Sequence, residues 1–163
     1  MRYRLISLLS LLLILGLVGC GFGDSEEDDG GEIPGGADPE AAGVIKDWAD
    51  DLRGGDLEAA ADHFQLPSLA QNGTAPIQLT TRNQVRAFNA SLPCGAELTA
   101  AEDHGRFTIA TFELTERPGA GECGTGVGET AKTAFVIEDG LITRWIRVVD
   151  KDELAPPAES PVV

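Results

Sequence analysis

The hydrophobic periodicity of this chain changes once, near Pro93, and that change restricts the folds open to it. Between Ala41 and Leu92, apolar residues recur mainly every three or four positions, the period of a helix with one buried face. Beyond Pro93, the chain consists of β-rich runs separated by turn residues. Helices followed by a run of strands indicate an α+β domain, with helices covering one face of an antiparallel sheet.

Three amphipathic helices are expected in the first part of the chain. The first, over 39–53, follows an aspartate that can cap it, begins with proline and ends at Gly54-Gly55. The second, over 57–66, repeats the helical spacing as far as Phe64. The third, over 82–92, opens with a Thr-x-x-Gln capping box.

Strand-like sequence dominates the second part of the chain. The Asp139-Gly140 pair between two β-rich runs is a strong signal for a tight hairpin. A shorter extended piece is expected at 77–79, before the third helix. The main predicted strands cover 97–102, 106–116, 130–138 and 141–149.

The N-terminal residues have the charge pattern of a secretory signal. Arg2 and Arg4 precede an apolar run that ends near Val18, which is shorter than the roughly 20 residues needed to span a bilayer. The tetrad Leu17-Val18-Gly19-Cys20 resembles the lipobox of bacterial lipoproteins, in which the cysteine carries diacylglycerol. This resemblance implies a lipid-anchored, extracytoplasmic protein with Cys20 as the lipidated residue. An ordinary signal peptide with a cysteine near its cleavage site is the alternative.

These signals divide the chain into four parts. Residues 1–19 form the signal peptide, and residues 20–38 carry the lipidated cysteine and a glycine-rich acidic tether. The folded domain is expected over 39–150. Residues 151–163, which contain three prolines, are expected to form a disordered tail.

The net charge of −15 excludes one broad class of partner. Nucleic-acid binding needs clustered Lys and Arg, and the sequence has no basic stripe. No metal or cofactor is expected, because His63 and His104 lack metal-ligand spacing and the GxGxxG letters at 119–124 lie between two strands. The expected partners are the membrane, through the lipid anchor, and a small apolar ligand or an envelope protein. The sequence is also compatible with a homodimer.

Three cysteines would be an odd count for a secreted protein. Lipidation of Cys20 leaves Cys94 and Cys123 as an even pair outside the cytosol, which predicts a disulfide. A reactive thiol is the alternative, but neither cysteine has a histidine or a Lys/Arg cluster nearby in the sequence to lower its pKa.

Three segments in a fixed order resemble the SnoaL-like branch of the NTF2-like superfamily. They are Trp48-x-x-x-Leu52-x-Gly-Gly-Asp56-Leu57-Glu58-Ala59-Ala60, Arg82-x-x-Val85-x-x-Phe88 and Phe135-x-Ile137-x-Asp139-Gly140-x-Ile142-x-x-Trp145. The resemblance implies a cystatin-like cone, in which a curved sheet wraps around the first helix and a pocket lies between them. The candidate lining residues of this pocket are aromatic: Trp48, Phe64, Phe88, Phe112 and Trp145.

The resemblance leaves three functions open. The leading prediction is a non-catalytic module that binds a small apolar ligand or a partner protein. The second is an acid/base isomerase, dehydratase or cyclase, for which Asp47 and Asp150 are weak candidates because strand 135–137 has no ionisable residue and Tyr3 leaves with the signal peptide. The third is a structural role with a filled core. One fold hosts unrelated activities, so the fold alone does not choose between them.

Overall fold

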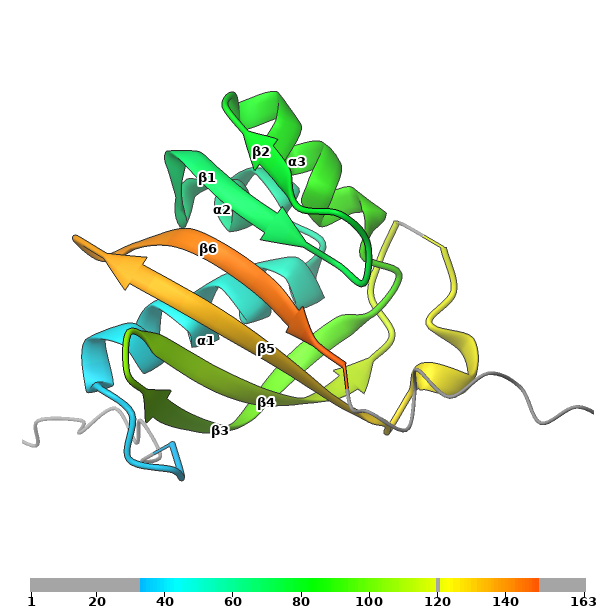
Figure 1. Cartoon of the computed structure of the whole chain (residues 1–163). Coiled ribbons are helices and arrows are strands. Elements are labelled where there is room, and N and C mark those ends of the chain that lie inside the picture. The colour runs from blue at the N-terminus through cyan, green and yellow to red at the C-terminus, as the bar shows by residue number, and fades with distance from the viewer. Residues whose placement is uncertain (1–32, 120, 150–163) are drawn as a thin grey trace, which may run out of the picture. The chain divides into compact units, whose positions relative to one another are not determined.

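The computed structural model describes residues 33–119 and 121–149, which form the folded domain (Figure 1). The signal peptide, Cys20, Asp150 and the C-terminal tail lie outside the described residues. No helix in the described part is long and apolar enough to cross a membrane. The elements are α1 (Pro39–Gly54), α2 (Leu57–Asp62), β1 (Phe64–Gln71), β2 (Ile77–Leu79), α3 (Arg82–Ser91), β3 (Gly95–His104), β4 (Phe107–Thr115), the 3-10 turn η1 (Gly124–Gly126), β5 (Thr130–Glu138) and β6 (Leu141–Val148).

Local capping signals set the ends of the helices. The Asp38 carboxylate accepts hydrogen bonds from the backbone amides of Glu40 and Ala41, and α1 ends at Gly55, which has a left-handed φ of 83°. The predicted capping box of α3 is present, because Thr81 and Gln84 each accept a hydrogen bond from the other's backbone amide. These helix boundaries are therefore confirmed almost to the residue.

The six strands form one sheet in the order β2-β1-β6-β5-β4-β3 (Figure 1). Strands β3 to β6 pair antiparallel with their sequence neighbours, as predicted. Strand β1 is parallel to β6, so the expectation of a purely antiparallel sheet is wrong at this one pairing. Two of the six strands also precede α3, so the helices are not all N-terminal to the sheet.

Strand β1 is the main element that the sequence pattern did not predict. The expected second helix runs to Phe64, but α2 ends at Asp62 and Phe64 is the first residue of β1. The Ile142 amide donates a hydrogen bond to the His63 carbonyl at 2.8 Å, and Phe64 is paired with Ile142. A partner almost 80 residues away along the chain thus outweighs the local helical spacing.

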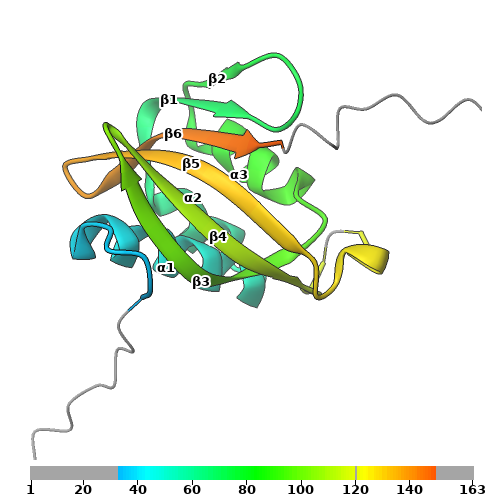
Figure 2. The same ribbon diagram turned by 60° about the horizontal axis from the view of Figure 1, so that its bottom comes forward.

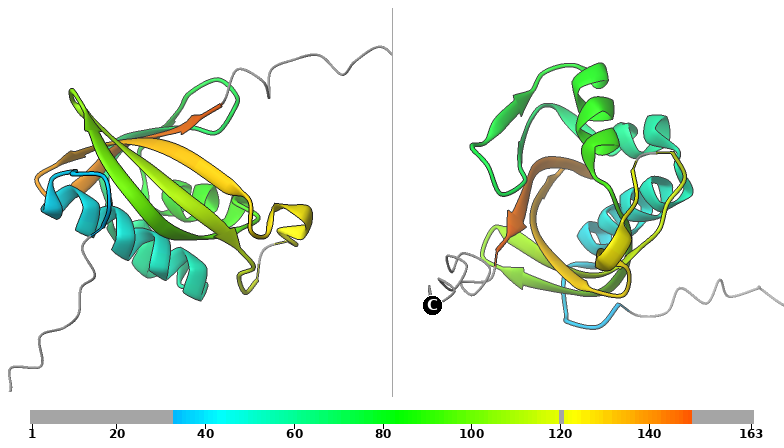
Figure 3. Two further views of the ribbon diagram at one scale, coloured as in Figure 1. Left: turned by 90° about the horizontal axis from the view of Figure 1, so that it is seen from below. Right: turned by 90° about the vertical axis from the view of Figure 1, so that its right-hand side faces the viewer.

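The sheet curves around α1, and the hydrophobic core fills the space between them (Figures 2 and 3). Trp48 of α1 lies at the centre of this core with only 2 % of its surface exposed. Its ring contacts those of Phe135 and Trp145 edge-on, at centroid distances of 5.6 and 6.3 Å. Register shifts in β1, β3 and the β5–β6 pair interrupt the ladder, and such irregularities bend and twist strands.

Candidate binding site

A cavity of about 170 Å³ opens beside Trp48, between α1 and the inner face of the sheet. We call it the aromatic cavity. Residues from α1, from the segments around β2 and β3, and from β4, β5 and β6 line it: Trp48, Leu52, Asn72, Leu92, Pro93, Cys94, Ala96, Phe112, Leu114, Ala131, Thr133, Trp145 and Arg147.

Three of the five predicted aromatic residues line this cavity. Trp48 comes from α1, Phe112 from β4 and Trp145 from β6. The ring of Trp48 contacts Phe112 edge-on, with centroids 6.2 Å apart. Ala131 and Thr133 of β5 and Arg147 of β6 also line the cavity. They were not among the predicted residues, although the alternation of side chains along a strand places them on its inner face.

Phe64 and Phe88 do not line the cavity, which corrects the predicted set. Phe88 packs edge-on against Trp145 at 5.1 Å, and Phe64 packs against Phe88 at 6.3 Å. Both rings are buried in the core behind Trp145. They support the cavity wall from the side away from any ligand.

A buried amide holds one of the two indole rings in place. The Trp48 Nε1–H donates a hydrogen bond of 3.3 Å to the Oδ1 atom of Asn89, which is fully buried on α3. Sequence reasoning missed Asn89, although an asparagine on the apolar stripe between Phe88 and Leu92 is the signal that could have revealed it. The Nε1–H of Trp145 is also buried but has no hydrogen-bond partner among the described residues.

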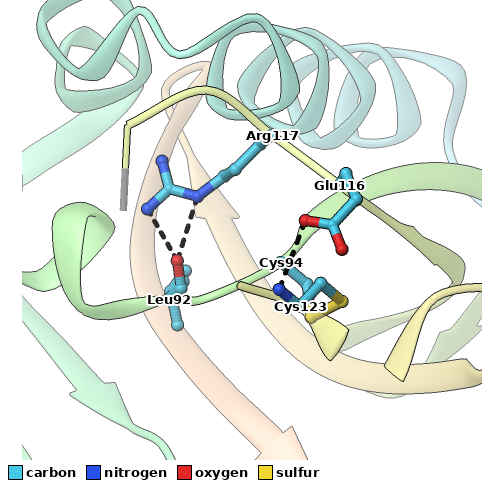
Figure 4. The surroundings of a disulfide bond; sticks show 5 residues. All are labelled: Leu92, Cys94, Glu116, Arg117 and Cys123. Atoms are coloured by element: carbon cyan, nitrogen blue, oxygen red, sulfur yellow. Dashed lines mark hydrogen bonds between the residues drawn. A yellow bond between two sulfur atoms is a disulfide. The ribbon is translucent and has the colours of Figure 1, made fainter. Parts of the chain in front are cut away.

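The predicted disulfide between Cys94 and Cys123 is present beside the cavity (Figure 4). It joins the residue before β3 to the long loop between β4 and β5, over a sequence separation of 29 residues. The backbone amide of Cys123 also donates a hydrogen bond to the Glu116 carboxylate at 3.3 Å. Since Cys94 lines the aromatic cavity, the bridge fixes part of the cavity rim.

Arg117 fixes the same loop at a second point (Figure 4). Its guanidinium is buried and donates hydrogen bonds to the carbonyl oxygens of Asn89, Ala90 and Leu92 at the end of α3. Burial lowers the pKa of Arg117, which stays charged at neutral pH because arginine starts from such a high value. The charge and the donors together satisfy the free carbonyls of a helix that ends without glycine.

Sequence comparison places the chain in no known family, because no protein-family model and no curated protein matches it. Structure comparison is informative. An NTF2-like protein of unknown function from Cytophaga hutchinsonii matches with a TM-score of 0.51 and 11 % identity, over 68 % of this chain and 90 % of the other. The chain has an NTF2-like fold. A de novo designed protein with a curved β-sheet matches with a TM-score of 0.52 and 16 % identity, over 72 % of this chain and 90 % of the other.

One further matching structure carries the name of a candidate enzyme. A candidate polyketide cyclase from Sinorhizobium meliloti matches with a TM-score of 0.49 and 20 % identity, over 65 % of this chain and 94 % of the other. At this level of similarity, that name says nothing about the activity of this chain.

The predicted acid/base residues do not meet in the cavity of the NTF2-like domain. Asp47 is exposed on α1 and is absent from the cavity wall, and Asp150 lies outside the described residues. A carboxylate–imidazole contact exists elsewhere, since Asp51 Oδ2 lies 2.9 Å from His63 Nε2, but neither residue lines the cavity. Within residues 33–119 and 121–149, no group of three or more His, Cys, Asp or Glu side chains is placed to hold a metal ion.

Proposed function

We propose that this protein is a lipid-anchored, extracytoplasmic protein of a bacterial cell whose NTF2-like domain binds a small apolar ligand without converting it. The composition of the cavity wall carries the proposal. The described residues that line it include two tryptophans and a phenylalanine but no Asp, Glu, His or Tyr. An acid/base enzyme needs such a group within hydrogen-bond reach of its substrate, whereas an apolar wall with few polar groups suits binding.

The size of the cavity limits the ligand. Its volume of about 170 Å³ is close to that of an engineered apolar cavity of roughly 150 Å³ that admits benzene. We therefore expect a ligand with one aromatic ring or a short branched chain. Thr133, Asn72 and Arg147 are the polar side chains on the wall, so a ligand with one polar group would direct that group towards them.

Tryptophan fluorescence offers a direct test of ligand binding. The chain has two tryptophans, and both line the aromatic cavity, so their emission reports on its occupancy. Titration with benzyl alcohol, hexanoate and related small apolar molecules that do not emit in the tryptophan range should give a saturable change in emission for at least one compound. No saturable change with any member of the panel would contradict small-ligand binding. The remaining functions would then be a module that binds a partner protein and a structural role.

Two substitutions on β5 distinguish an effect on the cavity from a general effect on the sheet. Ala131→Leu places three extra carbons on the cavity wall and should weaken binding at least tenfold. Ala134→Leu adds the same carbons to the opposite face of β5, where binding should be unchanged. Equal losses in both variants would show that the effect is not specific to the cavity.

Lipid anchoring rests on the lipobox-like tetrad and is supported by the disulfide, which is typical of oxidising compartments outside the cytosol. Two or three acyl chains give a lasting anchor, whereas one chain holds only marginally. Cys20→Ala or treatment with globomycin should block maturation or release the protein from the membrane fraction. Unchanged partitioning would contradict the anchor.

An acid/base enzyme of the SnoaL-like type, acting on a small apolar substrate, is the second candidate. The contact between Asp51 and His63 is the observation in its favour, since it joins a carboxylate to a possible proton carrier. If a small apolar compound is turned over, Asp51→Asn and His63→Gln should abolish turnover, whereas Ala131→Leu should not, because neither Asp51 nor His63 lines the aromatic cavity. Turnover that survives both substitutions would exclude these residues as the acid or base.

A further inference from the structure

A second concavity, of about 310 Å³ and polar in character, shares no residue with the aromatic cavity. We call it the arginine groove. It lies on the outer face of the sheet, because Val136 follows the buried Phe135 and points to the opposite side. The groove is lined by Pro67, Ser68, Leu69, Gln78, Arg106, Val136, Glu138, Thr143 and Arg144.

Two neighbouring strand pairs are irregular where they form this groove. In the β5–β6 pair, Val136 faces Arg144 and Ile137 faces Ile142, so Thr143 is an extra residue. In the β1–β6 pair, Phe64 faces Ile142 and the next partner of β6 is Leu69, which faces Arg144. Bulges redirect side chains and are common next to binding sites. Here they bring Thr143 and Arg144 to the same wall, beside the looped-out part of β1.

The two arginines of the groove differ from the cations on the helices. Each of the helix cations Lys46, Arg53, Arg82 and Arg86 is paired with a carboxylate. By contrast, neither Arg106 nor Arg144 has a carboxylate within ion-pair distance in the described part of the chain. Arg106 lies over the ring of Phe107 at 5.0 Å from its centroid, which leaves its N–H donors available.

We propose that the arginine groove binds an oxyanion, a carboxylate or phosphate group carried by a small polar molecule. Guanidinium groups recognise both anions through paired N–H donors. The carboxylate of Glu138, on the same wall, is an acceptor for a hydroxyl or ammonium group of the same molecule. The chain would then have two independent binding sites, an apolar one inside the sheet and a polar one outside it.

Calorimetric titration of the full chain in mild detergent tests this site, with inorganic phosphate and lactate as probes and chloride at matched ionic strength as the reference. At least one probe should bind saturably, and the stronger of the two identifies the anion class. Arg106→Gln and Arg144→Gln should each weaken binding tenfold or more, since each loses a charge-assisted hydrogen bond. Lys132→Gln, which removes an exposed cation on β5 outside the groove, should leave binding unchanged.

Two outcomes would overturn the proposal: neither probe binding more strongly than chloride, or Lys132→Gln weakening binding as much as the arginine substitutions. Arg106 lies in an exposed turn, so Arg106→Gln decides the matter if Arg144→Gln does not fold. The variant Ala131→Leu, which fills the aromatic cavity, should bind the oxyanion normally. Oxyanion binding by Ala131→Leu therefore tests the arginine groove independently of whether the aromatic cavity binds an apolar ligand.

Discussion

Arg117 donates two hydrogen bonds to the carbonyl oxygen of Leu92, from Nε at 3.0 Å and from Nη2 at 2.6 Å. The two residues are 25 positions apart, yet this contact ends α3. Because Pro93 follows at once and no glycine closes the helix, the carbonyl of the buried Leu92 would otherwise have no donor among the described residues.

Replacing Arg117 should therefore destabilise the domain. Arg117→Met keeps much of the aliphatic stem but removes the donors, and we expect a loss of about 2–3 kcal/mol in the free energy of unfolding. Urea titration followed by circular dichroism measures it. Arg53→Met is the control, because Arg53 is also a cation in the last turn of a helix but is exposed, so its loss should cost less than about 0.5 kcal/mol. Equal effects would contradict a special role for Arg117.

The disulfide between Cys94 and Cys123 should also stabilise the domain. Closing a loop of this length restricts the unfolded chain by about 3–4 kcal/mol in the entropy model. We expect a loss of that order in the double variant Cys94→Ala/Cys123→Ala. Reductant should produce a comparable loss in the native chain and no further loss in the double variant. A native chain unaffected by reductant under denaturing conditions would contradict the bridge.

Helix starts could be predicted from the sequence because their signals are local. The caps at Asp38 and Thr81 act within three residues, and the structure has both. Strand β1 could not be predicted in the same way, since its parallel partner β6 is distant in sequence and its own segment carries Pro67. Local spacing then favoured a longer second helix, and the pairing of Phe64 with Ile142 outweighed it.

The cavity was partly predictable for a related reason. Aromatic residues on buried faces identified Trp48, Phe112 and Trp145, but the same criterion selected Phe88, which packs behind them. Aromatic side chains report burial, and only their arrangement in space separates a cavity wall from a filled core. The role of Arg117 was invisible for the same reason, since its partner lies on another element.

Asp50 is expected to make a pH-dependent contribution to the stability of the domain. Burial raises its pKa, but the hydrogen bonds from Arg53 and Lys46, at 2.7 and 2.8 Å, outweigh burial and lower the pKa below its usual value. A lowered pKa in the folded state gives stability that is present above the unfolded pKa of about 3.9 and is lost as the pH falls through the folded value. The cluster is partly exposed, so the effect should stay below about 1 kcal/mol.

Comparison with Asp50→Asn isolates this contribution. The variant should be less stable than the native chain at pH 7, and the difference should shrink as the pH falls below the usual aspartate value of about 3.9 and Asp50 becomes protonated. Urea unfolding of both chains at pH 7 and about pH 2.5 measures the two differences. A difference that grows towards low pH would mean that the carboxylate is destabilising in the folded state.

The segment before α1 closes part of the edge of β3, and one glycine makes this possible. The Ala101 amide donates to the Pro34 carbonyl at 2.8 Å, and the Ala37 amide donates to the Ala101 carbonyl at 3.2 Å. A Cβ on Gly35 would overlap the Ala101 carbonyl, and its φ of 120° already disfavours a side chain. Gly35→Ala should therefore detach the segment and speed hydrogen exchange at the Ala37 and Ala101 amides. Gly36→Ala is the control, because its φ of 78° imposes a similar backbone strain but a Cβ there meets no atom within 4 Å. Equal acceleration in both variants would attribute the effect to backbone strain and not to the contact with β3.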